Sequence, residues 1–223
     1  MRFTVHPKKA RAGAVFLVCG MSACLFGVVA CGVNLGPQQQ APKSQTYTLE
    51  YPPPAPSPGP PLSYILRVEP IEAIPFYRTD KIVYRETPFR REAYRYHKWQ
   101  APPGEMITYL LLRDLRAAGI FSAVLSPNSL LSPTHSLEGG IQEFLEEDSP
   151  KGWIAVLTLT MTLAAEYTPE QGRTVLFQHT YSEREPCAAN TPGALSEAMS
   201  RAMSRVSLQI LKDVRQTVMT SAP

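Results

Sequence analysis

The chain has 223 residues, of which 44% are hydrophobic and 18% are charged, with 22 Lys and Arg against 19 Asp and Glu. Four of the 22 basic residues and none of the acidic ones precede Cys31, so the part from Cys31 onward has 18 basic and 19 acidic residues, a net charge of −1. A chain without excess basic charge lacks the electrostatic footprint of a nucleic-acid-binding protein. The 193 residues from Cys31 onward fit one domain with a tether.

The first 30 residues have the pattern of a secretory signal peptide. Basic residues up to Arg11 are followed by an uncharged run over residues 12–32, which contains Val28-Val29-Ala30-Cys31. A basic start, an apolar stretch and a small residue before the cut are typical of such signals. The Val-Val-Ala-Cys sequence resembles the bacterial lipobox, in which a peptidase cuts before a cysteine that has received a diacylglycerol. We therefore predict a signal peptide over residues 1–30 and a lipidated Cys31 at the start of the mature chain.

Two other interpretations of this segment stay open. The run over residues 12–32 is about long enough to span a bilayer as an anchor, and Ala23-Cys24 offers an earlier cut. With cleavage before Cys31, the signal takes Cys19 and Cys24 with it, and Cys187 becomes the one free thiol of the mature chain. No intramolecular disulfide can then form, which leaves an intermolecular disulfide as the alternative role for Cys187.

Residues 31–61 are predicted to form a disordered, proline-rich tether. Its first part is polar and without periodicity, and residues 45–50 match a short edge strand. Seven prolines in residues 52–61 favour polyproline II, because proline fixes φ and lacks an amide donor. We interpret this stretch as a spacer, with a ligand for a proline-binding groove as the alternative. Fully extended, the tether reaches up to roughly 100 Å.

A single domain is predicted over residues 62–220. Its clearest strand has Leu157, Leu159, Met161 and Leu163 alternating with threonines, which is the period of a strand with one buried face. Residues 173–181 are its expected antiparallel partner across a turn at residues 168–172. Further strands are predicted over residues 63–68, 81–85, 93–99, 120–125 and 135–144, the last with a bulge favoured by Gly139 and Gly140.

Two helices complete the predicted domain. The first begins at Pro102-Pro103 and ends before Gly119, and the second has Thr191 as N-cap and Pro192 in the first turn. The apolar stripe of the second helix runs from Leu195 to Val218 and is interpreted as core, with a docking face as the alternative. The predicted fold is α+β, a mixed and largely antiparallel sheet covered by two helices in the order β-β-β-α-β-β-β-β-α.

The sequence gives no pattern for catalysis or metal binding. His97, His135 and His179 each lie alone on a predicted strand or strand end, and no H-E-x-x-H, C-x-x-C, G-x-S-x-G or phosphate-binding glycine loop occurs from Cys31 onward. We therefore expect no catalytic residues, no metal and no cofactor beyond the acyl lipid on Cys31. The chain is predicted not to be an enzyme.

Charge is unevenly distributed along the domain. Eight basic residues against five acidic ones lie between Arg67 and Lys98, whereas Glu138–Asp148 has five acidic residues and no basic one. A basic strand region suits lipid headgroups or an acidic partner. Solvated charges of both signs on a sheet face are the alternative.

Several short motifs resemble a known family. Ile82-Val83-Tyr84-Arg85, the segment Tyr94–Trp99 and the following Pro102-Pro103 with its helix are similar to the ABC-type transport auxiliary lipoprotein family. The lipidated cysteine, the predicted strand pair over residues 153–181 and the closing helix match the family in order. Members are lipoprotein partners of MCE-type lipid transport systems, such as the Pqi and Mla-like machines.

The resemblance implies a non-enzymatic role in a Gram-negative envelope. The acyl chains on Cys31, palmitate among them, would anchor the protein at the periplasmic face of the outer membrane, because Gly32 replaces the aspartate that retains lipoproteins in the inner membrane. Its partners would be a periplasmic MCE-type protein with its ABC permease and ATPase, with a homo-oligomer as an open alternative. The expected contact residues are Tyr84, Arg85, Tyr94, Tyr96 and Trp99. The alternative function is a structural or assembly lipoprotein of another outer-membrane transport complex.

Overall fold

The computed structural model describes residues 42–168 and 172–221, and these ranges contain nine strands, two α-helices and one 3-10 helix. The predicted signal peptide, Cys31 and the tip of the predicted turn at residues 169–171 lie outside the described residues. In chain order the elements are β1 (Gln45–Tyr47), β2 (Leu62–Val68), β3 (Glu72–Ala73), η1 (Pro75–Tyr77), β4 (Lys81–Thr87), β5 (Arg90–Trp99), α1 (Pro103–Ala118), β6 (Phe121–Leu125), β7 (His135–Ser149), β8 (Gly152–Thr168), β9 (Gly172–Pro186) and α2 (Pro192–Thr220).

Strand β7 is the centre of the sheet. Along one edge it pairs antiparallel with β8 over nearly its whole length. Along the other edge it pairs in succession with β2 at residues 135–137, β3 at residues 140–141 and β4 at residues 146–147, all parallel. Beyond these strands lie β9 next to β8, β6 next to β2, and β5 with β1 next to β4. The β2 end and the β4 end of β7 are therefore about ten residues, or roughly 30 Å, apart.

The sheet is mixed, as predicted, and the antiparallel ladders β7–β8 and β8–β9 contain most of its paired residues. The predicted bulge at the glycine pair is wrong, because the register shift of β7 falls between Ile141 and Glu143. Gly139 instead allows close packing. A Cβ atom at this position would lie 2.4 Å from the Met161 sulfur and 2.7 Å from the Thr160 carbonyl oxygen.

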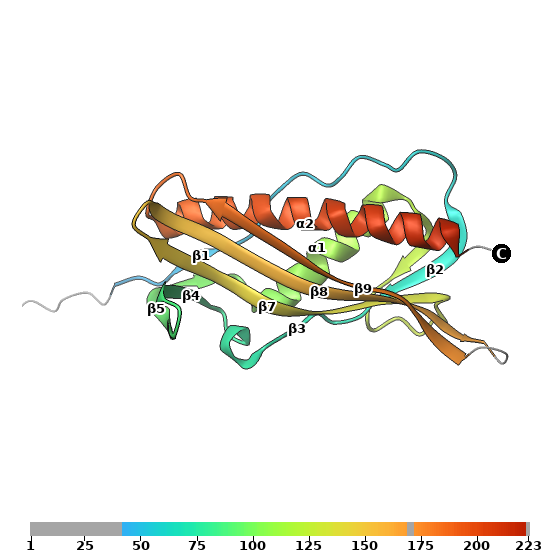
Figure 1. Ribbon diagram of the computed structural model, residues 1–223, viewed down its shortest axis with the longest axis horizontal. Helices are drawn as coiled ribbons and strands as arrows, with labels where there is room; N and C mark the ends of the chain where they lie inside the picture. Colours follow the sequence, from blue (N-terminus) through green and yellow to red (C-terminus); the bar gives the residue numbers. More distant parts are fainter. Residues whose placement is uncertain (1–41, 169–171, 222–223) are drawn as a thin grey trace, which may run out of the picture. The chain divides into compact units, whose positions relative to one another are not determined.

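Both helices cover the same face of the sheet (Figure 1). The α2 stripe from Leu195 to Val218 is buried together with Leu157, Leu159 and Met161 of β8, so it is core and not a docking face. The caps are as predicted, since the Thr191 side chain accepts a hydrogen bond from the Ala194 amide and Gly119 ends α1 at a φ of 62°. Neither described helix is long and apolar enough to cross a membrane.

The predicted boundary at residue 61 is wrong, because the folded unit begins near β1. Residues 48–61, here called the strap, run across the helices from the β5 end to the start of β2 (Figure 1). The amide of Glu50 donates to Ser200 Oγ at 3.0 Å, and the amide of Ser57 donates to the Ala118 carbonyl at 2.8 Å. Prolines cannot join a sheet through their nitrogens, but their carbonyls still accept, as Pro58 does from Arg215 at 2.9 Å. The proline content therefore predicted correctly that residues 52–61 are extended. The prediction that they are disordered is wrong.

A buried carboxylate joins the strap to both helices. Asp114 of α1 is fully buried and accepts from Tyr51 Oη of the strap at 2.7 Å, from Ser207 Oγ of α2 at 2.6 Å and from Arg113 Nε at 2.9 Å. Burial and the neighbouring carboxylate raise the pKa of Tyr51, so its hydroxyl stays a donor. A buried charge is tolerated only when it is paired and hydrogen-bonded, so the strap contributes to the stability of the helix layer.

We expect Tyr51→Phe to lower the free energy of unfolding by about 1 to 3 kcal/mol, because it removes one donor from a buried carboxylate. Urea denaturation of the purified protein measures this change. Tyr47→Phe is the matched control, since that hydroxyl contacts Gln45 and His97 and no buried carboxylate, and a change below about 0.5 kcal/mol is expected there. Equal effects of the two substitutions would show that the strap does not stabilise the domain.

Candidate functional site

The five residues predicted to contact a partner lie on β4 and β5, but the structure divides them among different environments. Tyr84 and Tyr94 lie together, with ring centroids 4.9 Å apart. Arg85 alternates to the opposite face of the sheet, as neighbours in a strand do. Trp99 is core, and Tyr96 is exposed. The five residues are close in sequence, but they do not form one contact surface.

Trp99 is not available to a partner. Only 2% of its surface is exposed, and its ring packs edge-on against Phe144 at 5.2 Å. Its amide donates to the Asp80 carbonyl at 2.6 Å. The position holds β5 against β7, so the prediction that Trp99 contacts a partner is wrong for this side chain. A large aromatic residue at the end of a strand suits either a core or an interface, and only tertiary packing decides between the two.

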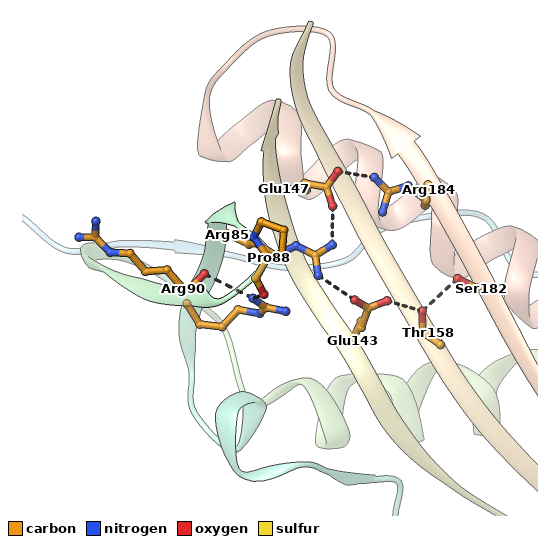
Figure 2. Close-up of polar contacts among 9 residues, drawn as sticks. Arg85, Pro88, Arg90, Glu143, Glu147, Thr158, Ser182 and Arg184 are labelled. Carbon is orange, nitrogen blue, oxygen red and sulfur yellow. Dashed lines mark hydrogen bonds and ion pairs between the residues drawn. The ribbon is translucent and has the colours of Figure 1, made fainter. Parts of the chain in front are cut away.

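Arg85 is the centre of an ionic network on the face of the sheet away from the helices (Figure 2). Its side chain is 16% exposed and donates to Glu143 at 3.1 Å and to Glu147 of β7. Glu147 also accepts from Arg184 of β9. Thr158 of β8 donates to Glu143 at 3.0 Å and lies 3.0 Å from Ser182 Oγ. The network thus links four strands.

The pKa shifts agree with a structural role for this network. Burial alone would lower the pKa of Arg85, but hydrogen bonds to Glu147 and Glu143 outweigh it and raise that pKa. The hydrogen bond from Arg184, with a further one from Arg85, lowers the pKa of Glu147. The two terminal nitrogens of the Arg85 guanidinium, Nη1 and Nη2, each donate to a carboxylate of this chain. Arg85 therefore clamps the strands and is not free to bind a partner.

Tyr94 reaches a buried carboxylate beneath the helix layer. Its hydroxyl lies 3.0 Å and 3.1 Å from the two oxygens of Glu146, whose residue is 1% exposed. Burial raises the pKa of Glu146 to about 7, although the hydrogen bond from Tyr94 opposes the shift. Burial and the charge of Glu146 raise the pKa of Tyr94. The carboxyl group of Glu146 therefore titrates near neutral pH. The ring of Trp153 lies 6.3 Å from that of Tyr94.

Cys187 borders the same site and is a weak nucleophile. It is half-buried, and burial together with the charge of Glu146 raises the pKa of its thiol to about 11. The thiolate is the reactive form of cysteine, so little of it exists at neutral pH. This environment argues against a ready intermolecular disulfide at Cys187.

The three histidines are on different strands and have different partners. His97 lies 3.2 Å from the Tyr47 hydroxyl, His135 lies 2.9 Å from Thr134 Oγ1, and His179 lies 3.3 Å from Asp213. Burial lowers the pKa of His135. Within residues 42–168 and 172–221, no group of three or more His, Cys, Asp or Glu side chains could hold a metal ion.

The surface that remains for contact was largely missed from the sequence. An apolar groove of about 550 Å³ lies between the start of α1, the β3–η1 segment and residues 127–128, and is lined by Ile71, Tyr77, Tyr109 and Leu112 among others. Tyr109 is 67% exposed and Phe76 on η1 is 65% exposed. The helical period of α1 places Tyr109 outside the buried apolar stripe. An aromatic residue at such a position is the signal that could have identified Tyr109 as a contact residue. For Phe76, a two-residue strand followed by one 3-10 turn gives no periodicity to read.

We expect Glu146→Gln to change how stability depends on pH. The folded state keeps the Glu146 proton up to about pH 7, while the unfolded chain releases it near 4.5, so the folded state binds more protons in this interval and wild-type stability falls as pH rises through it. The variant keeps an acceptor for Tyr94 but has no proton to lose. Urea denaturation should show it gaining about 3 kcal/mol over wild type between pH 4 and pH 8.

The exposed Glu197→Gln substitution is the control for this measurement, and it should leave the pH profile as in wild type. A Glu146→Gln variant whose difference from wild type is the same at pH 4 and pH 8 would show that Glu146 does not titrate in this range.

Comparison with known proteins agrees with this geometry. The crystal structure of protein XCC0632 from Xanthomonas campestris superposes with a TM-score of 0.70 at 19% identity, covering 79% of this chain and 98% of that chain. The hypothetical protein CT253 from Chlamydia trachomatis superposes with a TM-score of 0.53 at 9% identity, covering 72% of this chain and 100% of that chain. At these low identities, the TM-scores show a shared fold and nothing further.

Among curated proteins, none matches this sequence. The family profile described as ABC-type transport auxiliary lipoprotein component matches residues 47–211. That range extends from the end of β1, through the strap and the whole sheet, into α2. The chain therefore belongs to the family of ABC-type transport auxiliary lipoprotein components.

Proposed function

We propose that this chain is the membrane-anchored, non-enzymatic auxiliary lipoprotein of an MCE-associated lipid transport system. In this proposal, acyl chains on Cys31 hold it at the periplasmic face of the outer membrane, and the folded domain contacts a periplasmic MCE-type protein served by an ABC permease and ATPase. The observation that carries the proposal is the family match over residues 47–211. It includes nearly every described element, so the family assignment concerns the whole domain and not a short motif.

The arrangement of the polar residues supports a role in binding rather than in chemistry. Arg85 is enclosed by carboxylates of its own sheet, Glu146 is covered by Tyr94, and the three histidines are dispersed. A catalytic set needs a nucleophile and a base within hydrogen-bond reach of each other. The exposed aromatic side chains beside the α1 groove are instead typical of contact surfaces.

We propose the α1 groove as the surface that binds the MCE-type partner. Its floor is apolar, and Phe76 and Tyr109 project beside it with most of their surface exposed. Aromatic anchors around an apolar pocket often provide most of the binding energy in protein interfaces. Glu72 and Glu105 border this groove and would limit which partners bind.

A photo-crosslinking amino acid at Tyr109 or Phe76, placed in the native envelope, should capture a periplasmic MCE-type protein. Tyr109 lines the groove, and Phe76 is the exposed neighbour of Tyr77, which also lines it. The same probe at Gln209 of α2, which bonds Glu183 of β9 and does not line the groove, is the control and should capture little. Mass spectrometry identifies the product. Capture of a component of another outer-membrane complex would favour the structural or assembly function, and genes for a permease and an ATPase nearby would favour lipid transport.

Cys31→Ala should abolish labelling by palmitate and release the protein from the membrane fraction, because the thiol is the acceptor of the lipid. Cys24→Ala is the matched control and should leave both readouts unchanged. Reversed results would assign the modification to Cys24. A Cys31→Ala protein that remains in the membrane would favour a transmembrane anchor over residues 12–32.

A further inference from the structure

The chain enters the folded domain beside β5. Strand β1 runs parallel to β5, with Gln45 opposite His97, Thr46 opposite Lys98 and Tyr47 opposite Trp99. The described chain begins at Pro42, eleven residues after Cys31, and these eleven residues span at most about 40 Å. If Cys31 is lipidated, as the proposed function requires, the β5 edge is the part of the domain that the anchor holds closest to the bilayer. The strap follows β1 in the chain and is packed on the helices. It therefore does not lengthen the link between Cys31 and the domain.

This edge is basic, although the mature chain as a whole is not. We define the basic edge as Lys43, Lys81, Arg91, Arg95 and Lys98, on or beside β1, β4 and β5. Lys98 is 3.2 Å from Asp80, whereas the other four have no ion pair with any carboxylate that the structure describes. Lys81 and Lys98 lie opposite each other in the β4–β5 ladder. Like charges in this position destabilise a sheet, and among the described residues Asp80, paired with Lys98, offsets only one of the two lysines.

The tip of the β4–β5 hairpin adds an apolar residue to the basic edge. Phe89 is 100% exposed and lies between Pro88 and Arg90. The Arg90 side chain extends from the hairpin away from the Arg85 network (Figure 2). It is paired with Glu86 and Glu92, so it is not counted in the basic edge. Arg91 Nη1 donates to the Pro88 carbonyl at 2.9 Å, which orders the tip. An aromatic side chain beside basic ones is the composition of segments that bind at the surface of a membrane.

We propose that the basic edge and Phe89 bind the anionic phospholipid surface to which Cys31 is anchored. The lysines and arginines bind headgroup phosphates, and Phe89 inserts at the level of the acyl boundary. Two observations favour a bilayer over an acidic protein: the chain leaves the domain at this edge, and fewer than twelve residues separate it from Cys31, the proposed site of the anchor. The β2 end of β7, with the β6–β7 loop, then faces away from the membrane and leaves that end free for other contacts.

The test uses the full mature lipoprotein in vesicles of phosphatidylethanolamine and phosphatidylglycerol at 3:1, some of them containing brominated acyl chains. Phe89→Trp reports the hairpin tip, and Leu130→Trp, equally exposed on the β6–β7 loop, is the matched control. Wild-type fluorescence from Trp99 and Trp153 is subtracted. We expect quenching of Trp at position 89 and none at position 130, and we expect 0.5 M salt to weaken it, because salt screens headgroup attraction.

Adding Lys43→Gln and Arg95→Gln to Phe89→Trp should reduce occupancy of the lipid-bound orientation about 25-fold, at roughly five-fold for each basic residue removed. Quenching at position 89 should then fall to that at position 130. Protein that floats with the vesicles but shows equal quenching at both positions would overturn this inference and leave the anchor intact. Protein that does not float would contradict the anchor and this inference together. A crosslinker at position 89 that captures an acidic protein in place of phospholipid would also overturn it.

Discussion

The two-sided pairing of β7 is the constraint on which the rest of the structure depends. One edge holds β8 and through it β9, while the other edge holds β2, β3 and β4 one after another. Each short strand is thereby placed at a fixed height along a single long one. The sheet has two distinct ends as a result, with β4, β5 and β1 at one and β2 and β6 at the other. Helices α1 and α2 then have one continuous apolar face to cover.

Two buried carboxylates fix how separate segments meet around this sheet. Asp114 accepts from Tyr51 of the strap, and Glu146 accepts from Tyr94 of β5. In each case a tyrosine hydroxyl from a distant part of the chain satisfies an acidic group on an otherwise apolar face. A buried acceptor without its donor costs more than the bond itself contributes. The alternative packings that leave either carboxylate unsatisfied are therefore disfavoured, which makes these contacts a source of specificity as well as stability.

The distribution of polar contacts separates structural from exposed residues. The Arg85 network and the Tyr94–Glu146 pair are internal to the sheet, so the residues available to other molecules are at its margins. The α1 groove and the basic edge are on different elements, and they differ in chemistry, since one is mainly apolar and the other cationic. The two contacts we propose, one with a protein and one with a membrane, therefore use separate surfaces of the domain.

The sequence by itself determined both helices and the longer strands, because their signals are local: period-two alternation in β8, the Thr191 and Gly119 caps, and the α2 stripe. It did not indicate β3 or η1, which are too short to show a period. It also indicated the family through motifs on β4 and β5. Only the tertiary structure decided that the proline-rich strap is packed, since proline content describes the chain and not its neighbours. Likewise, whether Trp99, Arg85 and Tyr96 face core, network or solvent depends on a bulged β5 and on partners more than 40 residues away, which no local pattern encodes.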